Sequence, residues 1–136
     1  MISRFSGLHS FLSNFYPARV SLDGEVYRAV EYAYQAAKTT DEGLRLKVQE
    51  ALNSTLARRL GRHLGLRPGW EEMKLEIMEN LVRQKFQNPR LAEKLLETGT
   101  DELIEGNWWG DTFWGVCNGV GENHLGKILM KIRKEL

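Results

Sequence analysis

A short segment from Glu31 to Lys38 places four side chains capable of chemistry at helical spacing. They occupy positions i, i+3, i+4 and i+7: Glu31, Tyr34, Gln35 and Lys38. On a helix these share one face, and the first and last lie about 20° apart around the axis. A carboxylate stabilises developing positive charge, and a desolvated amine is a nucleophile. The same spacing also describes a solvated polar face. The opposite face is mostly alanine, which favours turning the polar face inward, toward a cleft.

A second segment, residues 106–115, holds three of the four tryptophans together with one carboxylate, one amide and three glycines. Indole faces stack on flat heteroaromatic rings, and glycine lets backbone approach a ligand closely. The candidate ligand-binding side chains here are Asn107, Trp108, Asp111 and Trp114. Such a segment suits a pocket for a base-bearing small molecule. A tryptophan-rich core turn is the alternative, and residue types alone favour it.

Two further groups offer polar recognition. Asn14 lies in the aromatic run Phe11–Pro17 and is the residue there that we expect to contact a ligand, in a segment that otherwise reads as a core plug. Arg58 and Arg62 flank Gly61, with Arg59 between them. Guanidinium groups bind phosphate in a bidentate manner, so these side chains are candidates for a phosphate clamp. A charged helix face is an equally good interpretation.

The sequence gives little support to metal, dinucleotide-binding or serine-hydrolase chemistry. His9, His63, His124 and Cys117 lack the spacing of metal ligands, and we expect no metal. The glycines near the C-terminus do not fit a dinucleotide fingerprint, and no Gly-Lys-Ser/Thr occurs, so we expect no cofactor. Gly-x-Ser-x-Gly is also absent.

Composition is ordinary for a soluble protein. The 136 residues are 42% hydrophobic and 27% charged, with a net charge of +1. This predicts one domain, residues 1–136, with a hydrophobic core, and it argues against a strong general field for nucleic acid. The first residues show no apolar signal region, no run is long enough to span a membrane, and a single cysteine fits a reducing compartment. We therefore expect a cytoplasmic protein without a membrane partner.

Local patterns predict the elements that must position these groups. Asp23-Gly24 predicts a hairpin turn. Helices are expected over 30–38, over 41–52 capped by Thr40, and over 54–60 ended by Gly61. Three more are expected, from Pro68 to Phe86, from the cap Asn88-Pro89, and from the cap Asn123 with an apolar stripe of Leu125, Ile128, Leu129 and Ile132. Residues 103–105 are a candidate strand. The predicted class is α+β, mainly helical, with a few short antiparallel strands.

An ordered series of motifs in this chain resembles the NADAR superfamily (NAD- and ADP-ribose-associated), and in particular its YbiA-like branch. The series covers nearly the whole chain: Phe11–Pro17, Glu31–Lys38, Ala57–Arg62, Trp70–Met78, Lys85–Pro89, Leu95–Gly99, Asp111–Gly115 and Asn123–Met130. The resemblance implies a compact α+β domain that cleaves N-glycosidic bonds. In the YbiA-like branch the substrates are ribosylated aminopyrimidine phosphates of riboflavin biosynthesis. Other branches remove ADP-ribose from guanine in DNA, so DNA would be a partner only as a modified substrate.

The resemblance also assigns roles to residues. Glu31 matches the family's acidic residue and Lys38 its active-site lysine. Trp108, Asp111 and Trp114 match the late motif around the ligand, and Asn14 matches the early one. The family often has glycine near position 117, where this chain has Cys117, which we interpret as tuning of the pocket.

The residues support a specific hypothesis for breaking a C1′–N bond. Glu31 stabilises the developing cation or assists ring opening, and Lys38 attacks C1′ to form a Schiff base. Indoles stack on the base while Arg58 or Arg62 holds a phosphate. The remaining substrate contacts are expected from Asn14, Tyr34, Gln35, Asn107 and Asp111. Two alternatives stay open: an ADP-ribosyl hydrolase acting on guanine in DNA, and a non-catalytic module that binds ADP-ribose or a nucleotide.

Overall fold

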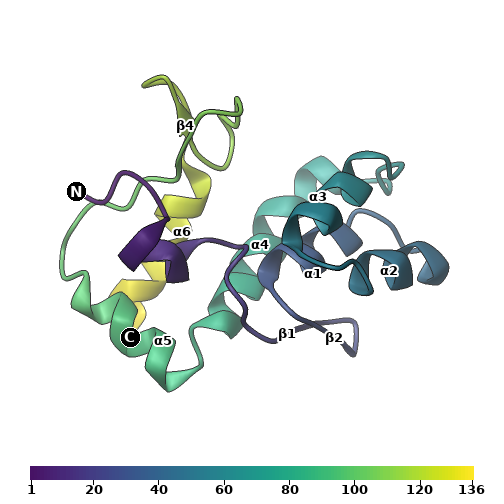
Figure 1. Ribbon diagram of the computed structural model, residues 1–136, viewed down its shortest axis with the longest axis horizontal. Coiled ribbons are helices and arrows are strands. Elements are labelled where there is room, and N and C mark those ends of the chain that lie inside the picture. The colour runs from purple at the N-terminus through teal and green to yellow at the C-terminus, as the bar shows by residue number, and fades with distance from the viewer. The chain divides into compact units, whose positions relative to one another are not determined.

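The computed structural model describes residues 1–136, which form two compact units. One unit comprises residues 14–85, and the other comprises residues 1–13 together with 86–136. Helices predominate and the strands are few and short (Figure 1). The mainly helical α+β class predicted from the sequence is confirmed. None of the helices combines the length and apolar character that crossing a bilayer requires.

The unit of residues 14–85 contains one hairpin and four helices. They are β1 (Val20–Leu22), β2 (Glu25–Tyr27), α1 (Val30–Ala36), α2 (Glu42–Gln49), α3 (Ser54–Arg62) and α4 (Trp70–Lys85). The hairpin is antiparallel, with Val20 opposite Tyr27. Its turn has φ 49° at Asp23 and φ 84° at Gly24, the left-handed pair that a type I′ turn needs. The sequence prediction for this turn is confirmed.

Helix α1 is the centre of this unit. Every residue from Val30 to Ala36 is buried, and the helix packs against α2, α3 and α4. Small alanine side chains let three neighbouring helices approach one short helix. The polar residues of α1 are therefore enclosed by protein.

Two details of the neighbouring helices differ from the sequence prediction. Asp41, not Thr40, caps α2: its side chain accepts a hydrogen bond from the backbone N–H of Leu44, at 2.9 Å. Helix α3 does not end before Gly61 but runs on to Arg62. Gly61 is buried in the contact between α3 and α1, where the lack of a side chain allows the two helices to pack closely.

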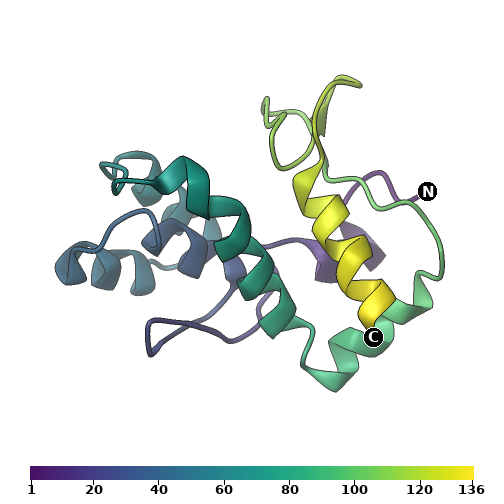
Figure 2. The same ribbon diagram turned by 180° about the vertical axis from the view of Figure 1, so that it is seen from behind.

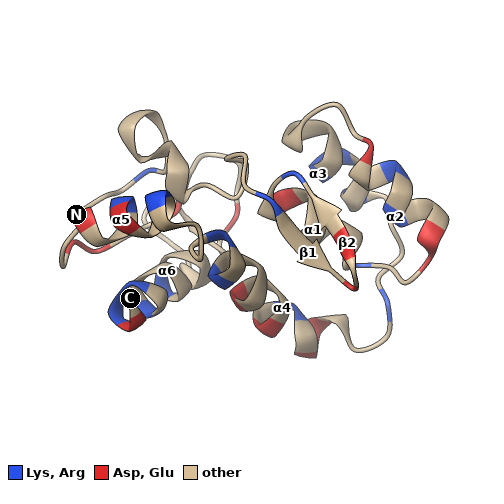
Figure 3. Ribbon diagram, turned by 90° about the horizontal axis from the view of Figure 1, so that it is seen from below, with Lys and Arg blue, Asp and Glu red and all other residues tan.

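Helix α4 is a continuous helix of 16 residues, visible along its length in Figure 2. Pro68 lies in the turn before it, as expected of a helix start. Charged residues of both signs are distributed along α4 (Figure 3). Ion pairs within the helix join Lys74 to Glu71 at 2.6 Å and Arg83 to Glu79 at 2.8 Å.

The other unit contains a 3-10 helix, two α-helices and one short strand pair. They are η1 (Gly7–Leu12), α5 (Pro89–Glu97), β3 (Gly106–Asn107), β4 (Val116–Cys117) and α6 (His124–Glu135). Asn88 caps α5 as predicted, accepting hydrogen bonds from the N–H groups of Arg90 and Leu91 at 2.9 and 3.3 Å. The predicted apolar stripe of α6 is buried, which is also confirmed.

Long-range pairing departs from the prediction in this second unit. β3 and β4 pair in parallel, so of the two strand pairs one, β1–β2, is antiparallel. The candidate strand 103–105 is reduced to an isolated bridge between Leu103 and Ile2. Asn123 precedes α6 as predicted, but its side chain makes no cap bond. It instead donates to Leu103 O and accepts from Glu105 N, both at 2.9 Å.

Candidate active site

Glu31 and Gln35 lie on the same face of α1 and are both buried, with 7% and 4% of their surface exposed. Gln35 Nε2 donates a long hydrogen bond, 3.4 Å, to Glu31 Oε1. A solvated polar face is therefore wrong as a description of this helix. A carboxylate held inside a protein exerts a stronger field than one in water, because little solvent screens it.

The Gln35 side chain is enclosed by a second helix. Gly61 of α3 lies directly against it. Gln35 Oε1 is buried and has no hydrogen-bond partner in the protein. Leaving a buried acceptor unmet costs free energy, so this contact between α1 and α3 is not favourable for stability alone.

Lys38 follows the end of α1 and is half-buried. Its Nζ lies 5.7 Å from the centre of the Tyr34 ring. Burial lowers the pKa of the Lys38 amine below its ordinary value, and the charges of Arg58, Arg62 and Lys74 lower it further. Glu31 acts in the opposite direction and raises this pKa. A lysine with a lowered pKa has a larger neutral, nucleophilic fraction near neutral pH.

The electrostatic neighbours of Lys38 include one residue that sequence reasoning missed, Lys74 of α4. Helix α4 presents its first residue, Trp70, to the same region, where its ring lies 5.4 Å from that of Tyr34. Lys74 follows one turn later, and its side chain is only 16% exposed. The sequence signal for Lys74 is its position four residues after Trp70, which begins α4, because this spacing places both residues on one face of the helix.

Asn14 lies at the other end of α1. Its backbone carbonyl accepts a hydrogen bond from Glu31 N at 3.1 Å, which satisfies one of the free N–H groups at the helix start. Its side-chain amide contacts the sulfur of Met78 at 3.5 Å. The next residue, Phe15, has the Arg58 guanidinium 5.9 Å from its ring centre. Arg58 is half-buried, whereas Arg62 is exposed.

Seven of the eleven predicted site residues thus lie in the unit of residues 14–85: Asn14, Glu31, Tyr34, Gln35, Lys38, Arg58 and Arg62. The other four, Asn107, Trp108, Asp111 and Trp114, lie in the second unit. Within it Asn107 ends β3, and the other three lie in the loop that joins β3 to β4.

Hydrogen bonds from Asn107 and Asp111 give this loop its shape. Asn107 Nδ2 donates to Asp111 O at 2.8 Å, and Asn107 Oδ1 accepts from Asp111 N at 3.0 Å. Asp111 Oδ1 accepts from the N–H groups of Phe113 and Trp114, at 3.1 and 2.9 Å. Trp114 packs edge-on against Phe113, but Trp108 is 80% exposed. The core-turn interpretation is therefore wrong at Trp108.

The fold and the site together define a mainly helical α+β protein that carries a buried carboxylate and a desolvated amine on one short helical segment. The NADAR domain model matches residues 4–136 of the sequence. The chain belongs to the NADAR family and to its YbiA-like branch.

Several named relatives are similar over most of the chain. N-glycosidase YbiA of Escherichia coli is 34% identical over 128 residues, which are 91% of this chain and 79% of that protein. An N-glycosidase of Nostoc punctiforme is 37% identical over 131 residues, 91% of this chain and 83% of that protein. A riboflavin biosynthesis protein of Vibrio vulnificus is 42% identical over 132 residues; they are 94% of this chain but only 36% of that protein.

A solved structure resembles the whole fold. The NMR structure of the E. coli protein YbiA matches with a TM-score of 0.85 and 32% identity, covering 99% of this chain and 84% of that one. The similarity extends through both units of the present chain.

Proposed function

We propose that this protein is an N-glycosidase that hydrolyses the C1′–N bond of ribosylated heterocycles, and that its substrates are aminopyrimidine ribosyl phosphates of riboflavin biosynthesis. The observation that carries the proposal is the pairing, on one face of α1 and its end, of a buried carboxylate with an amine of lowered pKa. The names of the E. coli, Nostoc and Vibrio relatives support the reaction class and the pathway.

The proposed reaction uses both groups and balances without an added oxidant or reductant. The neutral Lys38 amine attacks C1′ while Glu31 stabilises the positive charge that develops there. The C1′–N bond breaks, and the departing nitrogen receives the proton that the amine loses. The C1′–O bond of the ribose ring then breaks, the remaining proton on the Lys38 nitrogen passes to the ring oxygen, and a Schiff base forms between Lys38 and C1′. Water then adds to C1′ and releases ribose phosphate and the free amine. This route requires no metal.

The remaining residues are proposed to bind the substrate. Arg58 and Arg62, joined now by Lys74, form a cationic group suited to a phosphate. Trp108 and Trp114 offer indole faces to the base. Hydrogen bonds to the base edge or ribose are assigned to the polar side chains Asn14, Tyr34, Gln35, Asn107 and Asp111. We further propose that residues 1–136 act as one NADAR domain, because the family match runs through both units. The proposed location of this domain is the cytoplasm.

Product analysis with borohydride trapping tests the proposal. The pure protein is incubated with an aminopyrimidine ribosyl phosphate, and in parallel with DNA that carries ADP-ribose on guanine. We expect ribose phosphate from the first substrate and, on reduction, a covalent adduct at Lys38. Lys38→Ala should abolish the adduct, whereas Lys47→Ala, at an exposed position on α2, should leave it unchanged.

Three outcomes oppose the proposal. Release of ADP-ribose alone would assign the DNA substrate instead. Binding of either compound without turnover would point to a non-catalytic module. Full activity in Lys38→Ala would remove the lysine from the mechanism.

A further inference from the structure

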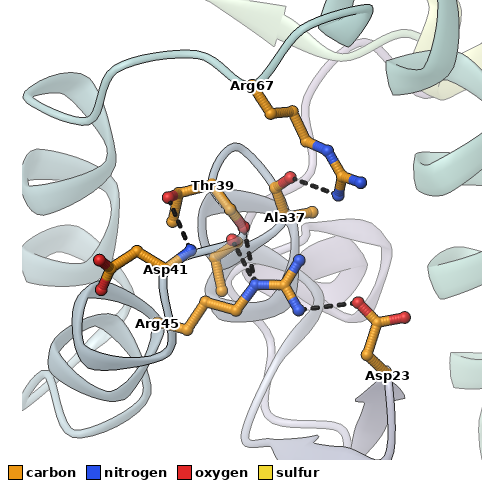
Figure 4. A network of polar contacts seen from close by, with 7 residues as sticks. Asp23, Ala37, Thr39, Asp41, Arg45 and Arg67 are labelled. Atoms are coloured by element: carbon orange, nitrogen blue, oxygen red, sulfur yellow. Dashed lines mark hydrogen bonds and ion pairs between the residues drawn. The ribbon is translucent and has the colours of Figure 1, made fainter.

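The backbone around Lys38 is held by two arginines that the mechanism does not use. The last carbonyls of a helix lack the i+4 partner within it, although Ala36 O also accepts a long bond from Thr39 N, at 3.3 Å. Arg45, on α2, donates from Nε to Ala36 O at 3.2 Å and to Thr39 O at 2.7 Å (Figure 4). These two carbonyls lie on either side of Lys38 in the sequence.

Arg67, in the segment between α3 and α4, holds the carbonyls in between. Its backbone N–H donates to Lys38 O at 2.8 Å. Its Nη1 donates to Ala37 O at 3.4 Å, and Figure 4 shows it approaching α1 from a different element than Arg45. Four consecutive carbonyls, those of residues 36–39, therefore each accept a hydrogen bond from one of two arginines.

Arg45 is itself held in place. Its Nη1 pairs with Asp23 Oδ2 at 2.7 Å, and Asp23 is the first left-handed residue of the hairpin turn. The Arg45 side chain is only 14% exposed. Its planar guanidinium donates to two carbonyls from Nε and to a carboxylate from Nη1, an arrangement that the single ammonium of a lysine cannot reproduce in full.

We propose that Arg45 and Arg67 are positioning residues that lock the backbone on both sides of Lys38 and so hold its amine where it can attack the sugar. This inference rests on the function proposed above. Helix α1 has only seven residues, and helix ends fray when their carbonyls are not satisfied. The Lys38 side chain is anchored at its backbone, so a displacement of that backbone moves the point from which the amine must reach the sugar. A displacement of about 1 Å in a reacting group can cost about a hundredfold in rate.

The two arginines act on the backbone of Lys38, whereas other charges act on its amine. The charged groups that act on the pKa of the amine are Glu31 from α1, Arg58 and Arg62 from α3, and Lys74 from α4. Neither Arg45 nor Arg67 is among them. Weakening the hydrogen bonds from Arg45 and Arg67 should therefore act on the amine through hydration, because a more exposed amine regains a pKa closer to its ordinary value.

The test replaces Arg45 and follows Lys38 by two independent measurements in the full chain. The first is the NMR titration of reductively ¹³C-methylated Lys38, which requires no activity and is assigned with Lys38→Arg. The second is the steady-state kinetics of the proposed substrate. In Arg45→Met we expect a higher Lys38 pKa and a kcat at least about tenfold lower, with KM changed by less than about threefold. Arg45→Lys should recover part of both effects.

Two further variants keep the test decisive. Arg90→Met removes an exposed arginine of α5 and should behave as wild type. If Arg45→Met does not fold, Asp23→Asn, which tolerates the left-handed turn and only loosens Arg45, should change the same two measurements in the same direction. A folded Arg45 variant with lower thermal stability but unaltered Lys38 titration and kcat would overturn the inference. An unaltered titration overturns the inference even in an inactive protein. A shifted titration without N-glycosidase activity upholds the positioning role of Arg45 and rejects the proposed function.

Discussion

The amide of Gln35 lies so close to Gly61 that a Cβ at position 61 would stand 1.9 Å from Gln35 Oε1 and 2.9 Å from Gln35 Cβ. Glycine is therefore required where α3 crosses the polar face of α1. Gln35 in turn donates to Glu31, so the contact reaches the candidate catalytic carboxylate through one side chain.

Gly61→Ala should destabilise the protein, because the new methyl group overlaps both ends of the Gln35 side chain. We expect the free energy of unfolding to fall by about 1–3 kcal/mol, measured by urea denaturation. Gly65→Ala is the matched control, since nothing lies within 4 Å of a Cβ there. Its effect should stay within about 1 kcal/mol of zero. Equal stability of the two variants would contradict the packing described here.

Glu31→Gln should lower turnover by about a hundredfold or more while the protein stays folded, because the change removes a charge and almost no volume. The measurement is kcat with the aminopyrimidine ribosyl phosphate, alongside thermal unfolding. Glu76→Gln, at an exposed position of α4, provides the comparison and should retain wild-type kcat. Turnover unaffected by Glu31→Gln would rule out a role for this carboxylate in the chemical step.

The pH dependence of adduct formation should report the lowered pKa of Lys38. Attack needs the neutral amine, so the rate rises with pH and levels off below the ordinary lysine pKa of 10.5. Arg58→Gln removes a cation that lowers this pKa, so the rising limb of the pH–rate profile should move to higher pH. Glu31→Gln removes the carboxylate that raises it, and the limb should move to lower pH. The exposed neighbour variant Arg59→Gln should leave the limb in place; shifts of the same sign in Arg58→Gln and Glu31→Gln would refute this electrostatic account.

Trp108→Ala should weaken substrate binding without affecting stability, because the indole is 80% exposed. Loss of one base-stacking contact corresponds to about 1–3 kcal/mol, roughly a 5- to 150-fold increase in Kd. Calorimetric titration in a Lys38→Ala background measures binding without turnover. Trp108→Phe should retain part of the affinity. Val120→Ala, which shortens another exposed apolar side chain in the same unit as Trp108, should retain the full substrate affinity. Unchanged affinity in Trp108→Ala would remove this residue from the proposed site.

Asn123→Ala should destabilise the protein by about 2–5 kcal/mol, since it removes two hydrogen bonds and places alanine in the left-handed region. Asn118→Ala separates the two causes, because Asn118 has φ 52°, close to the 54° of Asn123, but is exposed. The difference in unfolding free energy between the two variants measures the bonds to Leu103 and Glu105. No difference would show that those bonds contribute nothing to stability.

Features governed by neighbouring residues could be predicted from the sequence. Asp23-Gly24 fixed the hairpin turn, and Asn88-Pro89 fixed the start of α5, because the backbone angles and caps involve residues within a few positions of one another. The spacing of Glu31 and Lys38 likewise placed both on one side of a helix, since helical geometry is local.

Features governed by distant residues required the tertiary structure. By its propensity Gly61 should end a helix, but in the fold it lies against Gln35 of α1. By its position Asn123 should cap α6, but its side chain bonds to Leu103 and Glu105 instead. The alanine face favoured an inward orientation of Glu31, but the burial of Glu31 depended on α2, α3 and α4 packing around α1. The sequence by itself determined which side chains share a face; the packing of remote segments decided whether that face meets water, because burial is a property of neighbours that the local chain does not contain.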